Sequence, residues 1–89
     1  MVYPTINLNG TTAAVLLEQY RQASTMVCEA IAAVVRTEPN GRDYLDPSGD
    51  GRLLNAAQFE HSARMRALQG VYRDMQALAE HAVDSLAEG

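Results

Sequence analysis

Apolar residues recur at alternating spacings of three and four through two long stretches of the chain. This spacing places side chains on one face of an α-helix. The first stretch covers residues 12–37, and its stripe is Ala13, Leu16, Tyr20, Ala23, Val27, Ala30 and Val34. The second covers residues 53–87, and its stripe is Leu54, Ala57, His61, Met65, Leu68, Val71 or Tyr72, Met75, Leu78, Ala82 and Leu86. The pattern predicts an all-α chain.

Residues that cap or break helices set the expected boundaries. Thr11 or Thr12 can cap the first free amides of the first helix, and Pro39 stops that helix after residue 37. The loop of residues 38–52 is rich in Pro, Gly and Asp, as loops between helices are. The second helix is therefore expected to begin near residue 53.

Residues 1–11 are expected to form an extended arm. Pro4 and the pair Asn9 and Gly10 disfavour a helix. The apolar residues of the segment alternate as in an extended chain, at Val2, Tyr3, Ile6 and Leu8. Since the sequence holds no second strand pattern, we expect the arm to lie across the helices and cover apolar surface.

The two helices are expected to form an antiparallel hairpin in a single domain of residues 1–89. A turn near residues 44–47 would place Tyr20 near Tyr72 and Glu29 near His61. A second stripe lies beside the first on the N-terminal helix, at Leu17, Ser24, Ile31 and Val35. One partner helix cannot cover both stripes. We therefore expect a homo-oligomer, most simply a dimeric four-helix bundle, with higher symmetric oligomers also open.

Composition and charge narrow the function classes. Of 89 residues, 47% are hydrophobic but only 6% are aromatic, and a thin core of this kind favours a partner subunit. The formal net charge of −4 argues against nucleic-acid binding and against an anionic membrane surface, since both need a basic field. No stretch approaches the ~20 apolar residues of a membrane span, and the N-terminus lacks the pattern of a signal peptide. We expect a soluble, cytoplasmic protein.

Two features of residue usage bear on the chemistry. Cys28 is the only cysteine, so one chain can build no disulfide framework, and its apolar surroundings in sequence predict a buried, inert thiol. All seven basic residues are arginines. A GC-rich coding sequence would explain this, and so would bidentate recognition of phosphate or carboxylate, and both explanations stay open.

The sequence predicts neither an enzyme nor a metal or cofactor site. The run from Asp46 to Gly51 matches the start of a calcium loop, but the twelfth position is Ala57 where a glutamate is required, so we expect a solvated turn. His61 and His81 lack the spacing of a two-histidine metal site. We expect His61 to be a hydrogen-bonded core or interface residue and His81 to lie in a solvated acidic tail. No catalytic constellation or phosphate-binding loop is present.

The best candidate for a ligand site is the polar run in the loop together with two side chains of the second helix. Its residues are Asn40, Gly41, Arg42, Asp43, Tyr44, His61 and Arg64. Arg42 is suited to hold an anion and Tyr44 to stack on a base, as a nucleotide-like ligand requires. The alternative is structural: Arg42 and Asp43 pair with neighbouring residues, Tyr44 fills the end of the hairpin, and Arg64 pairs with Glu60 one turn earlier.

Two motifs give the chain a resemblance to a small family of phage and prophage proteins. They are the run INLNGT of residues 6–11, preceded by Tyr3, Pro4 and Thr5, and the run NGRDY of residues 40–44. The second helix adds Glu60, His61 and Arg64. The resemblance covers nearly the whole chain. It implies a phage accessory protein that acts in the cytoplasm of the bacterial host.

Two function classes follow from that context. Small, acidic, helical phage proteins known as sponges oligomerise and sequester nucleotide-derived immune signals, and the chain is similar to them in class. The first expectation is thus a non-enzymatic binding protein that counters host anti-phage defence. The alternative is a structural or assembly adaptor, or a chaperone, for a virion component that docks on the apolar face of the first helix.

Overall fold

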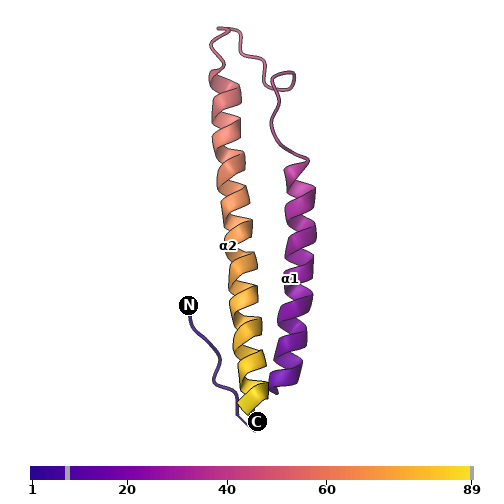
Figure 1. The fold of residues 1–89 in the computed structure, drawn as a ribbon. Helices are drawn as coiled ribbons and strands as arrows, with labels where there is room; N and C mark the ends of the chain where they lie inside the picture. The colour runs from indigo at the N-terminus through magenta and orange to yellow at the C-terminus, as the bar shows by residue number, and fades with distance from the viewer. Residues whose placement is uncertain (8, 89) are drawn as a thin grey trace.

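The chain forms two long helices that run antiparallel, side by side, in the computed structural model, which describes residues 1–7 and 9–88 (Figure 1). Helix α1 spans Ala13–Val35 and helix α2 spans Arg52–Glu88. The predicted all-α pair of packed helices is confirmed. At 1.5 Å per residue the 23 residues of α1 cover about 34 Å and the 37 residues of α2 about 56 Å.

The boundaries of α1 follow from local hydrogen bonds. The Thr12 hydroxyl accepts a bond from the Val15 amide at 3.2 Å, so the predicted cap is confirmed. The helix ends at Val35, two residues earlier than predicted. The amides of residues 36–38 each bond a carbonyl three residues back, and the Thr37 hydroxyl donates to the Val34 carbonyl at 2.7 Å. These tighter turns end the helix before Pro39 is reached.

The register of the hairpin differs from the predicted one. The Gln76 amide donates to the Ser24 hydroxyl at 2.7 Å, and Tyr20 packs on a cluster of Leu17, Ala79 and Ala82. Tyr20 therefore lies farther toward the C-terminal end of α2 than Tyr72 does. The predicted pairings of Tyr20 with Tyr72 and of Glu29 with His61 are wrong.

The path of the loop explains the shift in register. The prediction assumed a symmetric turn, but the longer α2 continues beyond the end of α1, and the loop rises alongside it (Figure 1). Pro39 and Ala57 are buried, and Gly41 lies so close to α2 that a Cβ there would be 3.8 Å from Leu54 Cδ2. Residues 36–51 thus cover the first turns of α2 where α1 does not reach.

The core inside one chain is thin. The buried hydrophobic residues are Ala13, Leu17, Ala57, Ala79 and Ala82, and among the described residues no large side chain is fully buried. Helix α2 sits over the N-terminal half of the second predicted stripe, where Leu17 and Ser24 are 9% and 6% exposed, whereas Ile31 is half-buried and Val35 is exposed. The first predicted stripe is left half-buried beyond Ala13. The prediction that one helix cannot cover both stripes agrees with this burial.

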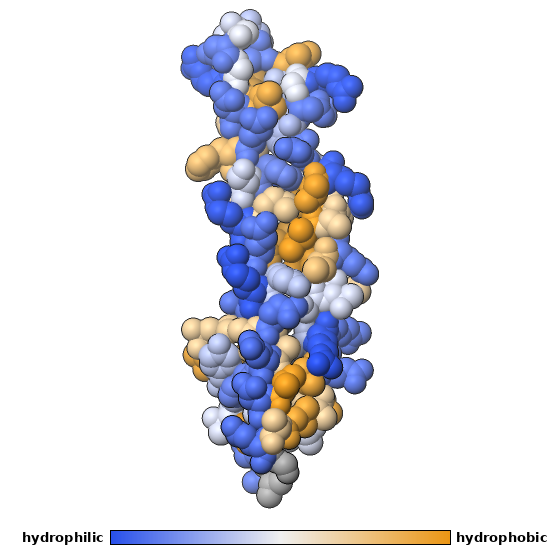
Figure 2. All heavy atoms as spheres, viewed as in Figure 1, coloured by the Kyte–Doolittle hydropathy of each residue, from blue (hydrophilic) through white to orange (hydrophobic). Residues whose placement is uncertain are grey.

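The dimensions of the hairpin show how much surface it leaves open. Its extents are 64 × 20 × 18 Å and its radius of gyration is 19.3 Å, whereas a compact chain of this length has about 12 Å. Its accessible surface is 6558 Å², against about 5,100 Å² for a compact monomer of 9.7 kDa. Orange apolar patches remain open on the face seen in Figure 2, separated by blue polar ones.

The N-terminal segment lies against α2 near the C-terminal end of that helix (Figure 1). The Tyr3 ring packs on the His81 ring at 5.0 Å between centroids, and residues 3–6 border a hollow with Ser85 and Glu88. The α2 side chains at this place are polar, whereas the sequence led us to expect apolar ones. Leu8, which the prediction included, lies outside the described residues.

No helix in the described part of the chain has both the length and the apolar character needed to cross a membrane.

The bond between Ser24 and Gln76 yields a stability prediction. Gln76→Ala removes the partner of a buried hydroxyl, so we expect the free energy of unfolding to fall by about 1 kcal/mol. In a Ser24→Ala background the same change should cost less, because no buried hydroxyl is then left unpaired. Urea unfolding of the four chains of this double-mutant cycle measures the difference. Equal costs in the two backgrounds would show that the bond does not couple the helices.

Candidate functional site

The polar run of the loop forms a turn that Asn40 organises. The Asn40 side-chain carbonyl accepts bonds from the amides of Arg42 at 3.0 Å and Asp43 at 3.1 Å. Its amide group donates to the Asp43 carboxylate at 3.0 Å. Asn40 and Asp43 therefore hold the turn by bonding each other, as Asn and Asp side chains commonly do in turns. The geometry therefore supports one part of the structural alternative for this loop, namely that Asp43 pairs with a neighbouring residue.

Gly41 matters in this turn because it has no side chain. The left-handed conformations in this loop belong to Gly49 and Gly51, with φ of 76° and 75°, and Gly41 is not among the glycines with positive φ. A side chain at Gly41 would come into contact with Leu54 instead. The glycine thus lets the turn lie close to the first turns of α2.

Arg42 and Tyr44 are exposed, and among the described residues neither side chain takes part in the hydrogen bonds of the turn. Among residues 1–7 and 9–88 the Arg42 guanidinium takes part in no ion pair, and its backbone amide alone is used in the turn. Tyr44 is 41% exposed and does not fill the end of the hairpin as the structural alternative had it. A free guanidinium and an accessible phenol ring thus stand two residues apart on a turn fixed by its own hydrogen bonds.

His61 and Arg64 do not join this turn in a pocket. His61 is half-buried and Arg64 is exposed on α2, about 10 Å and about 15 Å farther along the helix than Leu54, where Gly41 lies. The best-formed hollows of the described surface are lined by other residues and do not bring either one together with residues 40–44. The predicted pair of Arg64 with Glu60 is wrong, since the ion pair found among the described residues joins Arg52 to Asp50.

The second half of the loop uses its carboxylates to build the entry to α2. Asp46 accepts bonds from the Ser48 hydroxyl at 2.7 Å and the Ser48 amide at 2.9 Å, and these bonds lower the pKa of Asp46 below its ordinary value of 3.8. Asp50 accepts a bond from the Arg52 amide at 3.1 Å and pairs with the Arg52 guanidinium at 2.7 Å. The expected solvated turn into α2 is present. The described residues contain no group of three or more metal-ligating side chains.

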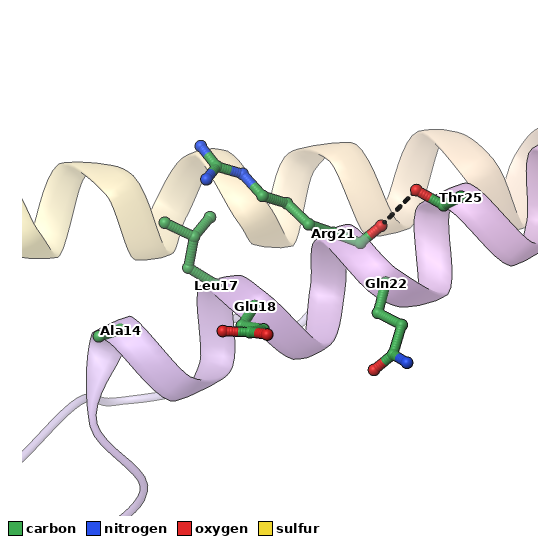
Figure 3. A pocket seen from close by; sticks show the side chains of 6 residues that line it. All are labelled: Ala14, Leu17, Glu18, Arg21, Gln22 and Thr25. Atoms are coloured by element: carbon green, nitrogen blue, oxygen red, sulfur yellow. Dashed lines mark hydrogen bonds between the residues drawn. The ribbon is translucent and has the colours of Figure 1, made fainter.

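Arg21 marks a shallow groove that the sequence did not point to. Its side chain extends toward α2 across the hollow drawn in Figure 3. It also borders two neighbouring hollows, one with Gln76 and Glu80, and one with Cys28, Tyr72 and Gln76. The only sequence signal for this groove was the cationic residue on an apolar helix, and nothing in the spacing showed which residues of α2 would face it.

Two predictions about single residues are wrong. Cys28 is exposed at the edge of this groove, because α2 sits over Leu17 and Ser24 and leaves position 28 beside the contact. His81 does not lie in a solvated tail. It is half-buried, and its Nε2 donates to the Pro4 carbonyl at 3.0 Å while its ring packs on Tyr3.

No family model, no curated protein and no solved structure matches this chain.

The Asp46 turn yields a prediction about acid titration. Ser48→Ala removes the hydroxyl donor, so the pKa of Asp46 should rise toward its ordinary value. Because the folded pKa is lowered, the stabilisation exists above pH 3.8 and is lost as the pH falls through the folded value. NMR titration of the Asp46 carboxyl carbon measures the shift, with Ser62→Ala as the control. An unchanged pKa in Ser48→Ala would contradict the assigned cause.

The contact of His81 with the N-terminal segment yields a second prediction. His81→Ala removes both the donor to Pro4 and the ring against Tyr3, so the segment should detach. Amide order parameters at Thr5 and Ile6 should then fall below about 0.6, measured by NMR relaxation. His61→Ala, on the same helix but away from the segment, should leave them unchanged. Order parameters that stay high in His81→Ala would show that other contacts hold the segment.

Proposed function

We propose that this chain is a self-associating, non-enzymatic binding protein that captures a small anionic and aromatic ligand at the turn of residues 40–44. The ligand class is a nucleotide-derived signal. The cell context is that of a phage accessory protein in the bacterial cytoplasm, which sequesters the signal and so counters host anti-phage defence. The context comes from the resemblance of the INLNGT and NGRDY motifs to phage and prophage proteins.

One observation carries the proposal: the free guanidinium of Arg42 and the exposed ring of Tyr44 project from a turn whose other polar groups are already bonded. A guanidinium binds phosphate with two parallel hydrogen bonds, and a phenol ring offers a face on which a base can stack. A turn fixed by Asn40 loses little conformational freedom when a ligand binds, so less of the binding free energy is lost.

The state of the nearby carboxylates favours binding over acid–base catalysis. Asp43 bonds Asn40, Asp46 bonds Ser48, and Asp50 pairs with Arg52. Each carboxylate thus has a role in stabilising its own turn, and that role explains its presence without a catalytic one.

Self-association is part of the proposal, because in one chain the turn faces open solvent. Residues His61 and Arg64 lie too far along α2 to close a pocket over the turn of their own chain. Pockets of this type form where subunits meet, and the thin core supports an assembly independently. In this proposal the N-terminal arm stays packed on α2 through His81.

An adaptor for a virion component is the second candidate, and one observation favours it. Leu45 and Phe59 are 77% and 72% exposed near the loop end of the hairpin. Large apolar side chains mark a protein-binding surface where they form one contiguous exposed patch. An adaptor would co-purify with a phage structural protein and would not respond to nucleotides.

A thermal-shift measurement tests the ligand site. The panel consists of cyclic dinucleotides, cyclic trinucleotides and ADP-ribose derivatives, each added in large excess. A ligand at 100 times its Kd should raise the melting temperature by roughly 10 °C or more, since it binds only the folded state. Arg42→Ala should weaken binding by roughly 10- to 100-fold, as expected for the loss of a charge-assisted bond.

Two comparisons sharpen this test. Tyr44→Phe keeps the ring and should bind like the parent chain, whereas Tyr44→Ala should not. Arg66→Ala, an exposed arginine of α2, is the matched control and should have no effect. No shift with any member of the panel would contradict the proposed ligand class. A shift that survives both Arg42→Ala and Tyr44→Ala would exclude the turn as the site.

A further inference from the structure

A continuous apolar stripe of α1 remains half-buried although α2 packs along the helix. The stripe consists of Leu16, Ala23, Val27, Ala30 and Val34, which follow one another at helical spacing. Helix α2 does not lie centrally over it, since the α1 residues that α2 buries most are Ala13, Leu17 and Ser24. The stripe contains no charged residue, and Tyr20, between Leu16 and Ala23, packs on the cluster of Leu17, Ala79 and Ala82. Water contact with apolar side chains is unfavourable, so covering the stripe would stabilise an assembly.

Helix α2 adds apolar residues beside this stripe. Val71 is 45% exposed, and Met75 and Leu78 are half-buried at the next positions of the same helical face. None of these three residues borders the groove of Arg21. The groove lies on the other broad side of the hairpin, where Arg21, Thr25 and Cys28 meet Tyr72 and Gln76. The hairpin thus carries Arg21, Thr25 and Gln76 on one broad side and a stripe without charged residues on the other.

We infer that the apolar face, formed by Leu16, Ala23, Val27, Ala30 and Val34 with Val71, Met75 and Leu78, is the surface on which a second copy of this chain docks. The two copies form a two-fold symmetric four-helix bundle whose groove faces point outward. The inference rests on the self-association in the proposed function and is independent of the ligand.

The surface area supports a second copy as the occupant. The hairpin exposes roughly 1,400 Å² more than a compact monomer of its mass. If each of two copies buried that excess, the interface would total roughly 2,800 Å², which lies in the range of obligate homodimers. A small ligand would cover far less of a face that runs the length of α1.

Charge and shape point to the same occupant. Each chain carries a net charge of −4, and contact through the uncharged stripe places no like charges directly opposite one another. Ala23 and Ala30 alternate with larger residues along it, and such notches and ridges fit a second copy of the same stripe. The N-terminal segment cannot serve as the cover, because Tyr3 and Pro4 are held at His81.

Adjacent positions on α1 allow a direct test, since Val27 belongs to the apolar face and Cys28 borders the groove. The parent chain, with its natural thiol at position 28, is compared with a Val27→Cys, Cys28→Ser chain, a change small enough to keep the fold. Each is brought to a concentration at which it sediments as a dimer and is treated with a disulfide reagent such as Ellman's. A Thr25→Cys, Cys28→Ser chain is the matched control, because Thr25 also borders the groove.

We expect the thiols at positions 28 and 25 to react as fast as in denaturant, and the thiol at position 27 to react at least about tenfold more slowly. Dilution to the monomer should remove that protection. A dimer in which position 27 reacts freely, or in which position 28 is protected, would overturn the assigned face while leaving self-association intact. A parent chain that sediments as a monomer at every concentration would overturn the assembly itself, whatever the ligand assay shows.

A charge substitution gives a second readout. Val27→Glu places a carboxylate on the apolar face, and Gln22→Glu places the same group on an exposed position of α1. Val27→Glu should shift sedimentation toward the monomer by at least about tenfold in dissociation constant, since burial of an unpaired charge is costly. Gln22→Glu should leave it unchanged. Equal behaviour of the two variants would contradict the assignment.

Discussion

Two helices can share only one line of contact, and the rest of this structure depends on where that line falls. Helix α1 is apolar over a wide arc, and α2 lies over the part of it that holds Leu17 and Ser24. The bond from Gln76 to Ser24 favours this arrangement, because the buried Ser24 hydroxyl needs a partner. The consequence is a hairpin with the groove of Arg21 on one side and a half-buried apolar face on the other.

The unequal lengths of the helices determine where the loop lies. Because α2 continues beyond the end of α1, its first turns would lack a partner if the loop turned back sharply. Residues 36–51 instead follow α2, with Pro39 buried and Gly41 close to Leu54. The turn at Asn40 is thereby attached to a helix, which gives Arg42 and Tyr44 a defined position at one end of the hairpin. The N-terminal segment is attached at the other end through His81.

The sequence was sufficient for the features that depend on local chemistry. Helical spacing predicted both helices, Thr12 predicted the cap, and the Asp and Gly residues predicted the solvated entry to α2. It was not sufficient to choose the face of α1 that meets α2, because two adjacent stripes were equally able to face α2 and their periodicity does not distinguish them. The error at Cys28 follows from that ambiguity, whereas the error in the Tyr20 pairing follows from the path of the loop along α2.

In the candidate site too, the local interactions could be predicted from the sequence and the long-range ones could not. The bonds of Asn40 with Asp43 span three residues, and the structural alternative for the loop anticipated local pairing of this kind. The contact of His81 with Pro4 joins residues near opposite ends of the chain, and no sequence pattern in either segment indicates the other as its partner. Whether His61 and Arg64 belong with Arg42 depends on a second chain, which no spacing within one chain can reveal.

The central claim is that one hairpin is an incomplete fold, and sedimentation equilibrium of the parent chain tests it most directly. The account predicts a species of two chains at micromolar concentration and above, with helical content and melting temperature that fall together on dilution. A single chain that stays monomeric over the whole accessible range, and that unfolds cooperatively at a temperature independent of concentration, would contradict it.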